Sequence, residues 1–172
     1  MKKIYDRIIQ EGSKITRKDL LKLNKENDKD YIPKDAKVVY VYSLVDKKIN
    51  YPNCDGTFIY IGEAGERVDG TGARFSQHIS TKANKGGNTG GNYTISRYYW
   101  NKEKIRLRIY IVDVCQDRKK IESQLILNHI KIYGAVPIAQ GCTSSKYTTD
   151  KIESLNIYNE IKEIFEMKNI IY

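Results

Sequence analysis

The sequence predicts one mixed α/β (α+β) domain in which a small, mostly antiparallel β-sheet is flanked by helices. Its 172 residues suffice for one compact domain but not for two well-packed ones. With 40% hydrophobic residues the chain can form a core, so it is not disordered throughout. Segments with strand character and segments with helical character alternate along the chain, which favours a sheet covered by helices.

Three segments are typical of β-strands. Residues 38–42 and 58–61 are rich in β-branched and aromatic residues, and the turn-forming residues between them predict an antiparallel hairpin with a long loop. In residues 105–111, apolar side chains alternate at period two with Arg106, Arg108 and Tyr110. This third strand should therefore have one buried face and one cationic face.

Four segments have the composition and spacing of helices: the stretch after Thr16, residues 71–82, residues 118–133 and the stretch after Asp150. Thr16 and Asp150 are suitable N-caps, and each is followed three residues later by an acidic residue. Gly134 is a suitable stop for the third helix. We expect the first and last helices to extend the central unit at its two ends.

The chain is strongly basic. Its 30 Lys and Arg residues exceed its 21 Asp and Glu residues, which gives a net charge of +9. This charge predicts a polyanionic partner, although an acidic membrane surface would suit the charge alone equally well. No apolar run approaches the length of a membrane span, and the N-terminal residues lack the features of a signal peptide. The three widely spaced cysteines form no disulfide or zinc pattern, so we expect a cytoplasmic protein.

Several residues are suited to phosphodiester hydrolysis, which needs an activated water and stabilisation of the negative charge on the phosphate and the leaving oxygen. Tyr40 and Tyr60 lie on adjacent predicted strands and could project from the same face. Arg74 has a planar fork that matches a phosphate, and His78 lies one helical turn further on. Glu122 offers a carboxylate to a hard divalent cation.

The order and spacing of these residues resemble the GIY-YIG nuclease family. The matching segments are Val38-Val39-Tyr40, Tyr60-Ile61-Gly62, Arg74-Phe-Ser-Gln-His78 and Glu122-Ser-Gln-Leu-Ile. The resemblance covers about residues 37–140, which would form the nuclease core of a single domain spanning residues 1–172. It implies that Tyr40 is the general base toward water, with Tyr60 beside it. It also implies that Arg74 and His78 act at the reacting phosphate and that Glu122 binds one Mg²⁺ or Mn²⁺.

Two departures from the family pattern concern the site. The first motif lacks the family's glycine, and its long spacing to Tyr60 is similar to that of the restriction-enzyme branch. Ala139 occupies the place where the family usually has an asparagine. The contact made by that asparagine is therefore missing, or Gln140 or another residue supplies it.

Each site residue also has a purely structural interpretation. The two tyrosines could be ordinary core residues, and an arginine and a histidine one turn apart are commonly a surface pair. Glu122 could be a solvated side chain paired with Lys119. Glycines at positions 65, 70 and 72 favour the functional interpretation, because they would let the backbone approach a ligand closely.

A loop over residues 82–93 is rich in Gly and Asn and lacks the context of a phosphate-binding P-loop, so no nucleotide cofactor is expected. Such a loop suits phosphates and base edges, although an ordinary surface loop is the alternative. The residues expected to contact DNA are Lys85, Asn88, Asn92, Arg97, Arg106 and Arg108.

The resemblance implies a metal-dependent type II restriction endonuclease that cleaves specific sites in double-stranded DNA. Such an enzyme would belong to a restriction–modification system and act as a homodimer, since both strands must be cut. Two alternatives remain open: a catalytically silent nucleic-acid-binding module with the same fold, and a structure-specific DNA repair nuclease of the same family.

Overall fold

A computed structural model describes residues 1–65, 70–79, 90–141 and 157–166, except for the side chains of residues 90–93 and Tyr158. Its central feature is a four-stranded sheet in the order β1-β6-β2-β5, in which every neighbouring pair is antiparallel. The strands are β1 (Lys2–Ile9), β2 (Val38–Leu44), β5 (Phe58–Ala64) and β6 (Ile105–Ile111). The expected α+β fold class is confirmed.

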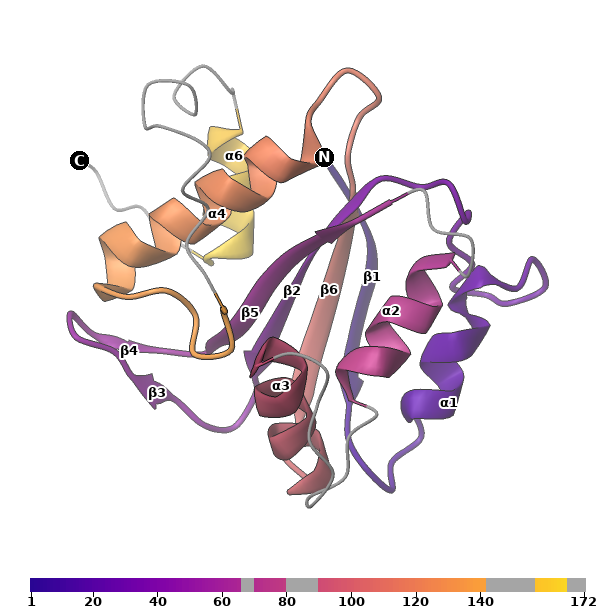
Figure 1. Cartoon of the computed structure of the whole chain (residues 1–172), viewed down its shortest axis with the longest axis horizontal. Coiled ribbons are helices and arrows are strands. Elements are labelled where there is room, and N and C mark those ends of the chain that lie inside the picture. The colour runs from indigo at the N-terminus through magenta and orange to yellow at the C-terminus, as the bar shows by residue number, and fades with distance from the viewer. Residues whose placement is uncertain (66–69, 80–89, 142–156, 167–172) are drawn as a thin grey trace.

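Helices cover both faces of this sheet. Figure 1 shows α4 (Arg118–Tyr133) and α6 (Tyr158–Ile164) on one side, and α1 (Arg17–Leu20) and α2 (Gly70–His78) on the other. The 3₁₀ helix η1 (Leu21–Asn24) follows α1, and α3 (Gly90–Trp100) packs on the same face as α2 through Ile95 and Tyr99. Strand β2 therefore contributes alternate side chains to two cores: Tyr40 and Tyr42 to the α2 side, Val39 and Val41 to the α4 side.

The predicted hairpin is confirmed: β2 pairs antiparallel with β5. Its long loop contains a small ladder of β3 (Ile49–Asn50) and β4 (Asp55–Gly56). The helix predicted over residues 118–133 has the expected bounds, and Gly134 ends it in the left-handed conformation with φ 78°. At α1, the Thr16 amide donates to the Asp19 carboxylate at 2.9 Å, as the predicted cap requires. Asp150 and its predicted cap lie outside the described residues.

The expectation of a cationic, solvent-facing side on β6 is wrong. Arg108 is only 4% exposed, and its guanidinium carbon lies 5.8 Å from the centre of the Phe58 ring. Arg106 forms two hydrogen bonds to Asp6 and one to Glu166. Tyr110, on the same face, packs in one core with Ile161 and Phe165 of the α6 segment. The α6 segment therefore covers the face of β6 that carries Arg106, Arg108 and Tyr110, although the periodicity of β6 alone predicts that this face is exposed.

The N-terminal extension is not simply helical, because it begins with the edge strand β1. This strand pairs with β6 over its whole length, with one irregularity between Lys3 and Tyr5. Helix α3 was also not expected, since its first turn lies in the predicted glycine-rich loop. Of the helices that the structure describes, none is long and apolar enough to cross a membrane.

Candidate active site

Strands β2 and β5 bring Tyr40 and Tyr60 together. Tyr42 is opposite Tyr60 in the register of this pair and Tyr40 is opposite Gly62, and the Tyr40 and Tyr60 ring centres are 6.1 Å apart. A Cβ atom at Gly62 would lie 2.5 Å from the Tyr40 hydroxyl oxygen and 2.6 Å from Cε1 of Tyr60. Only glycine leaves room here for both rings. The glycine after Tyr60-Ile61 therefore has a direct steric role in the site.

Helix α2 adds His78 and Arg74 to this pair. His78 is fully buried, with Nε2 at 3.5 Å from the Tyr40 hydroxyl and Nδ1 at 3.1 Å from the Tyr42 hydroxyl. Phe75 packs edge-on against the Tyr40 ring with a centre separation of 5.0 Å. In this structure the His78 ring therefore makes polar contacts with two tyrosine hydroxyls.

The half-buried Arg74 guanidinium acts on both hydroxyl groups, those of Tyr40 and Tyr60. Its charge and its hydrogen bonding lower the pKa of each tyrosine, but burial is the larger effect and raises the pKa of both above the ordinary value. The two tyrosines are therefore neutral at pH 7.

Glu122 lies on α4, which packs on the other face of the sheet. Its carboxylate reaches the outer edge of β5, where its charge acts on both Tyr40 and Tyr60. A backbone hydrogen bond links its carboxylate to Glu63. Two residues further back on β5, the Ile61 amide donates to the Gln140 side-chain oxygen at 3.3 Å, and the Ile59 carbonyl accepts from the Ala139 amide at 2.9 Å. The edge of β5 is thus occupied by α4 and residues 139–140. Gln140 makes a contact beside the site, whereas the Ala139 side chain is buried.

The carboxyl group of Glu122 has a strongly altered protonation equilibrium. Burial raises its pKa to about 7, and the negative charge of Glu63 acts in the same direction. Arg74, the backbone of Glu63 and Lys119 oppose the increase, with Lys119 contributing least of the three. An ordinary surface pair of Glu122 with Lys119 does not describe this environment. A cation bound beside Glu122 would favour its charged form.

Sequence reasoning missed three residues of the site. Tyr42 contacts His78, Glu63 lies beside Glu122, and the Arg118 Nε atom donates to the Glu63 carboxylate at 2.6 Å. Two of them had a signal in the sequence: Tyr42 shares a strand face with Tyr40, and Arg118 precedes Glu122 by one helical turn. For Glu63 the only signal is its position directly after the Tyr60-Ile61-Gly62 motif.

The glycines near Arg74 do not surround an open ligand site. A Cβ atom at Gly72 would lie 2.4 Å from the Leu20 carbonyl, and one at Gly70 would lie 2.4 Å from the Asn24 side chain. The Gly72 amide also donates to Asn24. Gly70 and Gly72 therefore allow α2 to pack closely on α1 and η1, which fixes the position of Arg74. The expectation that they serve a ligand is wrong for these two positions.

Of the residues expected to contact DNA, the three whose side chains the structure describes are not brought together: Arg97 lies on one side of the sheet, and Arg106 and Arg108 on the other. Lys85 and Asn88 lie outside the described residues, and only the backbone of Asn92 is described, in the first turn of α3. Arg97 is half-buried on α3, on the α2 side of the sheet. Arg106 and Arg108 contact Glu166 at the end of α6, on the opposite side. A direct contact of Arg108 with DNA is incompatible with its burial in this structure.

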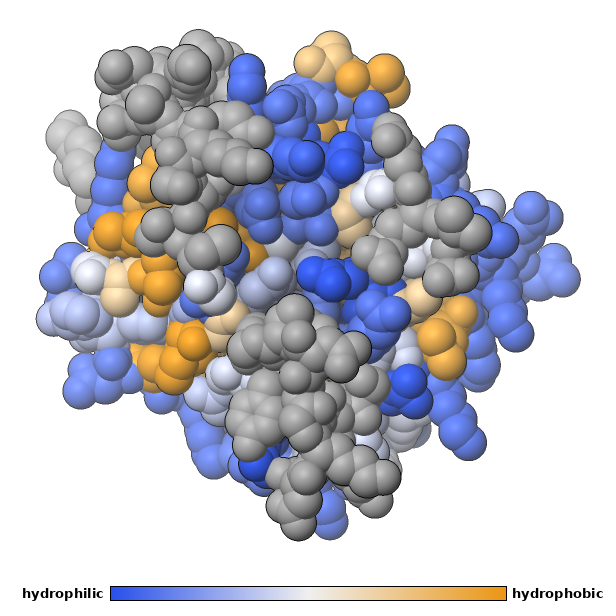
Figure 2. Space-filling model, viewed as in Figure 1, coloured by the Kyte–Doolittle hydropathy of each residue, from blue (hydrophilic) through white to orange (hydrophobic). Residues whose placement is uncertain are grey.

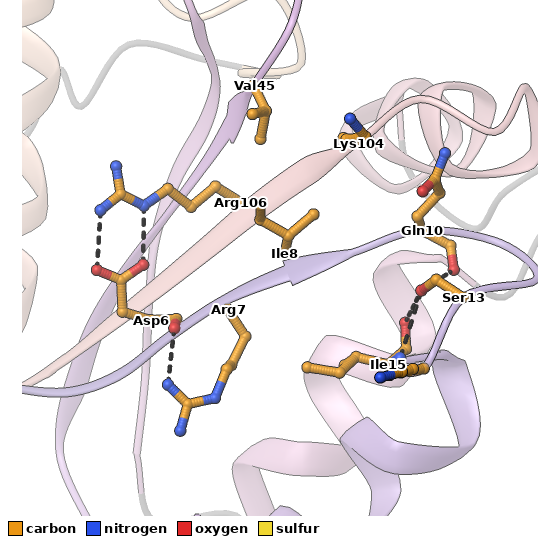
Figure 3. A pocket seen from close by; sticks show the side chains of 10 residues that line it. Asp6, Arg7, Ile8, Gln10, Ser13, Ile15, Val45, Lys104 and Arg106 are labelled. Carbon is orange, nitrogen blue, oxygen red and sulfur yellow. Dashed lines mark hydrogen bonds and ion pairs between the residues drawn. The ribbon is translucent and has the colours of Figure 1, made fainter.

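A groove of about 740 Å³ lies elsewhere, on β1 and the start of β6, and contains none of the predicted catalytic residues. Figure 3 shows Arg106 forming its paired hydrogen bonds with Asp6 in this groove. Arg7 pairs with Asp30, and Lys104 pairs with Asp46. Hydrophilic residues dominate the molecular face in Figure 2, where the hydrophobic residues form separate patches. In the groove, the charges of Arg7, Lys104 and Arg106 are therefore offset by the acidic residues with which they pair.

The donor set at Glu122 is compatible with a magnesium-type ion. Within the described ranges no group of three or more His, Cys, Asp or Glu side chains could enclose a metal. A hard ion that keeps most of its waters needs only one or two carboxylates, and Glu122, with Glu63 beside it, fits this requirement. A closed zinc-type site does not fit.

Comparisons of the chain with protein-family models, with curated proteins and with solved structures gave no match. A functional assignment therefore depends on the geometry of the chain's own residues.

Proposed function

We propose that this protein is a metal-dependent endonuclease of the GIY-YIG type that cleaves double-stranded DNA, and more specifically a type II restriction enzyme. One observation carries the proposal: five residues from four elements that are distant in sequence meet near one edge of the sheet. They are Tyr40, Tyr60, Arg74, His78 and Glu122. A structural role alone gives no reason why these residue types should converge.

Because Tyr40 is neutral, it can act as a general base toward water only in a particular way. A buried neutral hydroxyl accepts a proton from water only if it loses its own proton, and His78 Nε2 is the acceptor that faces it. The Tyr40 side chain is fully buried in this structure, so the proposed reaction requires that substrate binding opens a path to its hydroxyl. We propose that Tyr40 then takes a proton from the attacking water while its own proton passes to His78. The 3.5 Å separation is long for a hydrogen bond, but catalytic hydrogen bonds commonly shorten when substrate binds.

Arg74 supplies the fixed positive charge of the proposed site. Its guanidinium lies beside both tyrosine hydroxyls, so a phosphate placed over Tyr40 would come within its reach. Glu122 would hold a Mg²⁺ or Mn²⁺ ion, with Glu63 as its neighbour. When bound, this ion would stabilise the charge that develops on the phosphate and on the leaving oxygen.

The class of substrate follows from charge and symmetry. A net charge of +9 supports a polyanionic partner, and cleavage of both strands at one site would call for a homodimer. The absence of a disulfide pattern among the three cysteines supports a cytoplasmic location. The test is incubation of the purified protein with plasmid and Mg²⁺, with excess EDTA as the control. Discrete fragments support a restriction enzyme, and cleavage confined to branched DNA would identify a structure-specific nuclease instead. Binding without cleavage in any metal would contradict nuclease activity and identify a silent module.

A further inference from the structure

We infer that two residues of α3, Ser96 and Trp100, are positioning residues for the proposed reaction. They hold the C-terminal end of α2 and so place His78 opposite Tyr40. The inference rests on the proposed function for its catalytic meaning. The contacts between α3 and α2 are a property of the folded chain, so they can be tested without a substrate.

Helix α2 needs support from other elements to keep His78 in place. The helix has nine residues, Gly70–His78, and its first turn contains a second glycine, Gly72. Helices shorter than about 12–15 residues are marginal on their own in water, and glycine weakens a helix further. His78 is the last residue of α2, where hydrogen bonding within the helix ends. The position of His78 therefore depends on what the end of α2 contacts.

Two side chains of α3 bind backbone carbonyl groups at this end. The Ser96 hydroxyl donates to the His78 carbonyl at 2.8 Å. The Trp100 indole Nε1 donates to the carbonyl of the next residue, Ile79, at 3.2 Å. Carbonyl groups in the last turn of a helix have no partner within the helix. Helix α3 thus supplies hydrogen bonds that α2 cannot make itself.

Both donors lie on one face of α3, because Ser96 and Trp100 are four positions apart in the sequence. Figure 1 shows α3 beside α2, on the same face of the sheet. Helix α3 is itself anchored in the core through Ile95 and Tyr99. Ser96 is 1% exposed and His78 is fully buried, so little water can compete for the hydrogen bond between them. This face of α3 is therefore a fixed support for the end of α2.

Helix α1 contributes to the same support. The Arg17 Nε atom donates to the Ser76 carbonyl of α2 at 3.2 Å. The Arg17 backbone amide donates to the hydroxyl of Tyr99, which directly precedes Trp100 on α3, at 3.3 Å. The C-terminal half of α2 is thus linked to both α1 and α3. Of the two, only α3 contacts the carbonyl of His78 itself.

The placement of His78 matters because its separation from Tyr40 is already long, with Nε2 at 3.5 Å from the tyrosine hydroxyl. A shift of the His78 backbone would carry the ring with it and change this separation. A displacement of about 1 Å between reacting groups can reduce the rate by about 100-fold. Loss of a contact from α3 should therefore reduce the rate of cleavage rather than the affinity for DNA.

Ser96→Ala and Trp100→Phe each remove one of the two hydrogen bonds. We expect single-turnover cleavage to fall about 10- to 100-fold in each variant, with DNA affinity in EDTA within about twofold of the wild type. Ser76→Ala is the matched control. Ser76 is as buried as Ser96, but its hydroxyl has no hydrogen-bond partner in the described part of the chain. This substitution leaves the Ser76 backbone carbonyl in place, and the variant should cleave at the wild-type rate.

Two NMR signals test the support without DNA. Trp100 is the only tryptophan in the sequence, so the protein has a single indole N–H signal. We expect this N–H to exchange slowly with solvent in the wild-type protein, because it donates to a carbonyl. The ring signals of His78, assigned with the help of His129→Gln, should move in Ser96→Ala and in Trp100→Phe, while those of His129 stay unchanged. A purely structural role would lower stability without moving the His78 signals.

Two results would overturn the inference: wild-type cleavage by Ser96→Ala or Trp100→Phe, or unchanged His78 signals in either variant. If a variant does not fold, the wild-type protein decides, and rapid solvent exchange of its indole N–H would overturn the inference. Wild-type protein that cleaves no DNA would instead overturn the proposed function. The His78 signals would then still show whether α3 places this side chain.

Discussion

Gly62 lies directly opposite Tyr40 in the β2–β5 pairing, where a single added methyl group would come within 2.5 Å of the tyrosine oxygen. Gly62→Ala should therefore displace the Tyr40 and Tyr60 rings. We expect a loss of about 1–3 kcal/mol of unfolding free energy from overpacking, and a fall in cleavage rate of about 100-fold or more from misplacement of the base. Urea unfolding and single-turnover cleavage measure the two effects.

The matched control is Gly141→Ala, because no atom of the described residues lies within 4 Å of the position its Cβ would take. This variant should remain within about 0.5 kcal/mol of the wild-type stability and should cleave normally. Wild-type activity in Gly62→Ala would show that the position of the tyrosine rings does not matter for cleavage.

Arg74→Ala should abolish most cleavage while leaving specific DNA binding largely intact. The side chain is placed to act on one phosphate among many contacts, and loss of one such donor commonly reduces the rate by about 10² to 10³. The measurement is cleavage under single-turnover conditions, with DNA affinity determined in EDTA. Arg7→Ala, which removes an ion-paired arginine from β1, is the control and should cleave at the wild-type rate. Equal rates for the two variants would remove Arg74 from the site.

Glu122→Gln should lose Mg²⁺-dependent cleavage without losing the fold. Glutamine keeps the size of the side chain but removes the charge that would attract the metal. Because burial and Glu63 disfavour the charged carboxylate, we expect the unfolding free energy at pH 8 to stay the same or to rise. DNA affinity without metal should also stay the same or rise. An exposed glutamate, Glu26, provides the control substitution Glu26→Gln, and wild-type rates for Glu122→Gln at low Mg²⁺ would contradict the assignment.

His129 should make the protein less stable in mild acid, while Glu122, whose pKa burial raises from 4.5 to about 7, should act in the opposite direction over the same pH range. The His129 contribution is therefore read from the difference between the wild type and His129→Gln. Burial lowers the pKa of the His129 side chain from 6.5 to about 4 in the folded state, so between these values the unfolded chain binds the proton more strongly. The contribution of neutral His129 to stability is therefore complete above pH 6.5 and decreases as the pH falls toward 4, by up to about 3 kcal/mol. Urea unfolding at pH 7.5 and pH 4.5 measures it. As the pH falls between these two values, the unfolding free energy of His129→Gln should change more favourably than that of the wild type, by up to about 3 kcal/mol, and an equal change in both proteins would refute this origin.

The sequence was most informative where one segment determines its own structure. Helix 118–133 carries its own apolar stripe and stop signal, and the β2–β5 hairpin follows from two strand segments with turn residues between them. The five catalytic candidates were found because their motif order is specific. Their convergence in space is a separate observation, which the sequence did not contain.

The predictions from sequence were wrong where segments distant in the chain meet. The periodicity of β6 describes its two faces but cannot show that the α6 segment covers Arg108, and β1 becomes a strand through its pairing with β6. Likewise, Gly70 and Gly72 accommodate η1 and the end of α1, a helix contact that local composition does not reveal. Glu63 belongs to the site only because α4 reaches the edge of the sheet beside it.

That edge has a consequence for how the protein avoids self-association. An outer strand with unpaired backbone groups can recruit a strand from another molecule and so begin aggregation. On β5 the positions open to such recruitment are held by Ala139, Gln140 and Glu122. The carboxylate proposed to bind the metal thus also helps to shield the strand. If α4 detached from β5, the strand edge would become exposed and the proposed metal ligand would be displaced in the same event, so a partly unfolded molecule prone to aggregation would also lack the proposed active site.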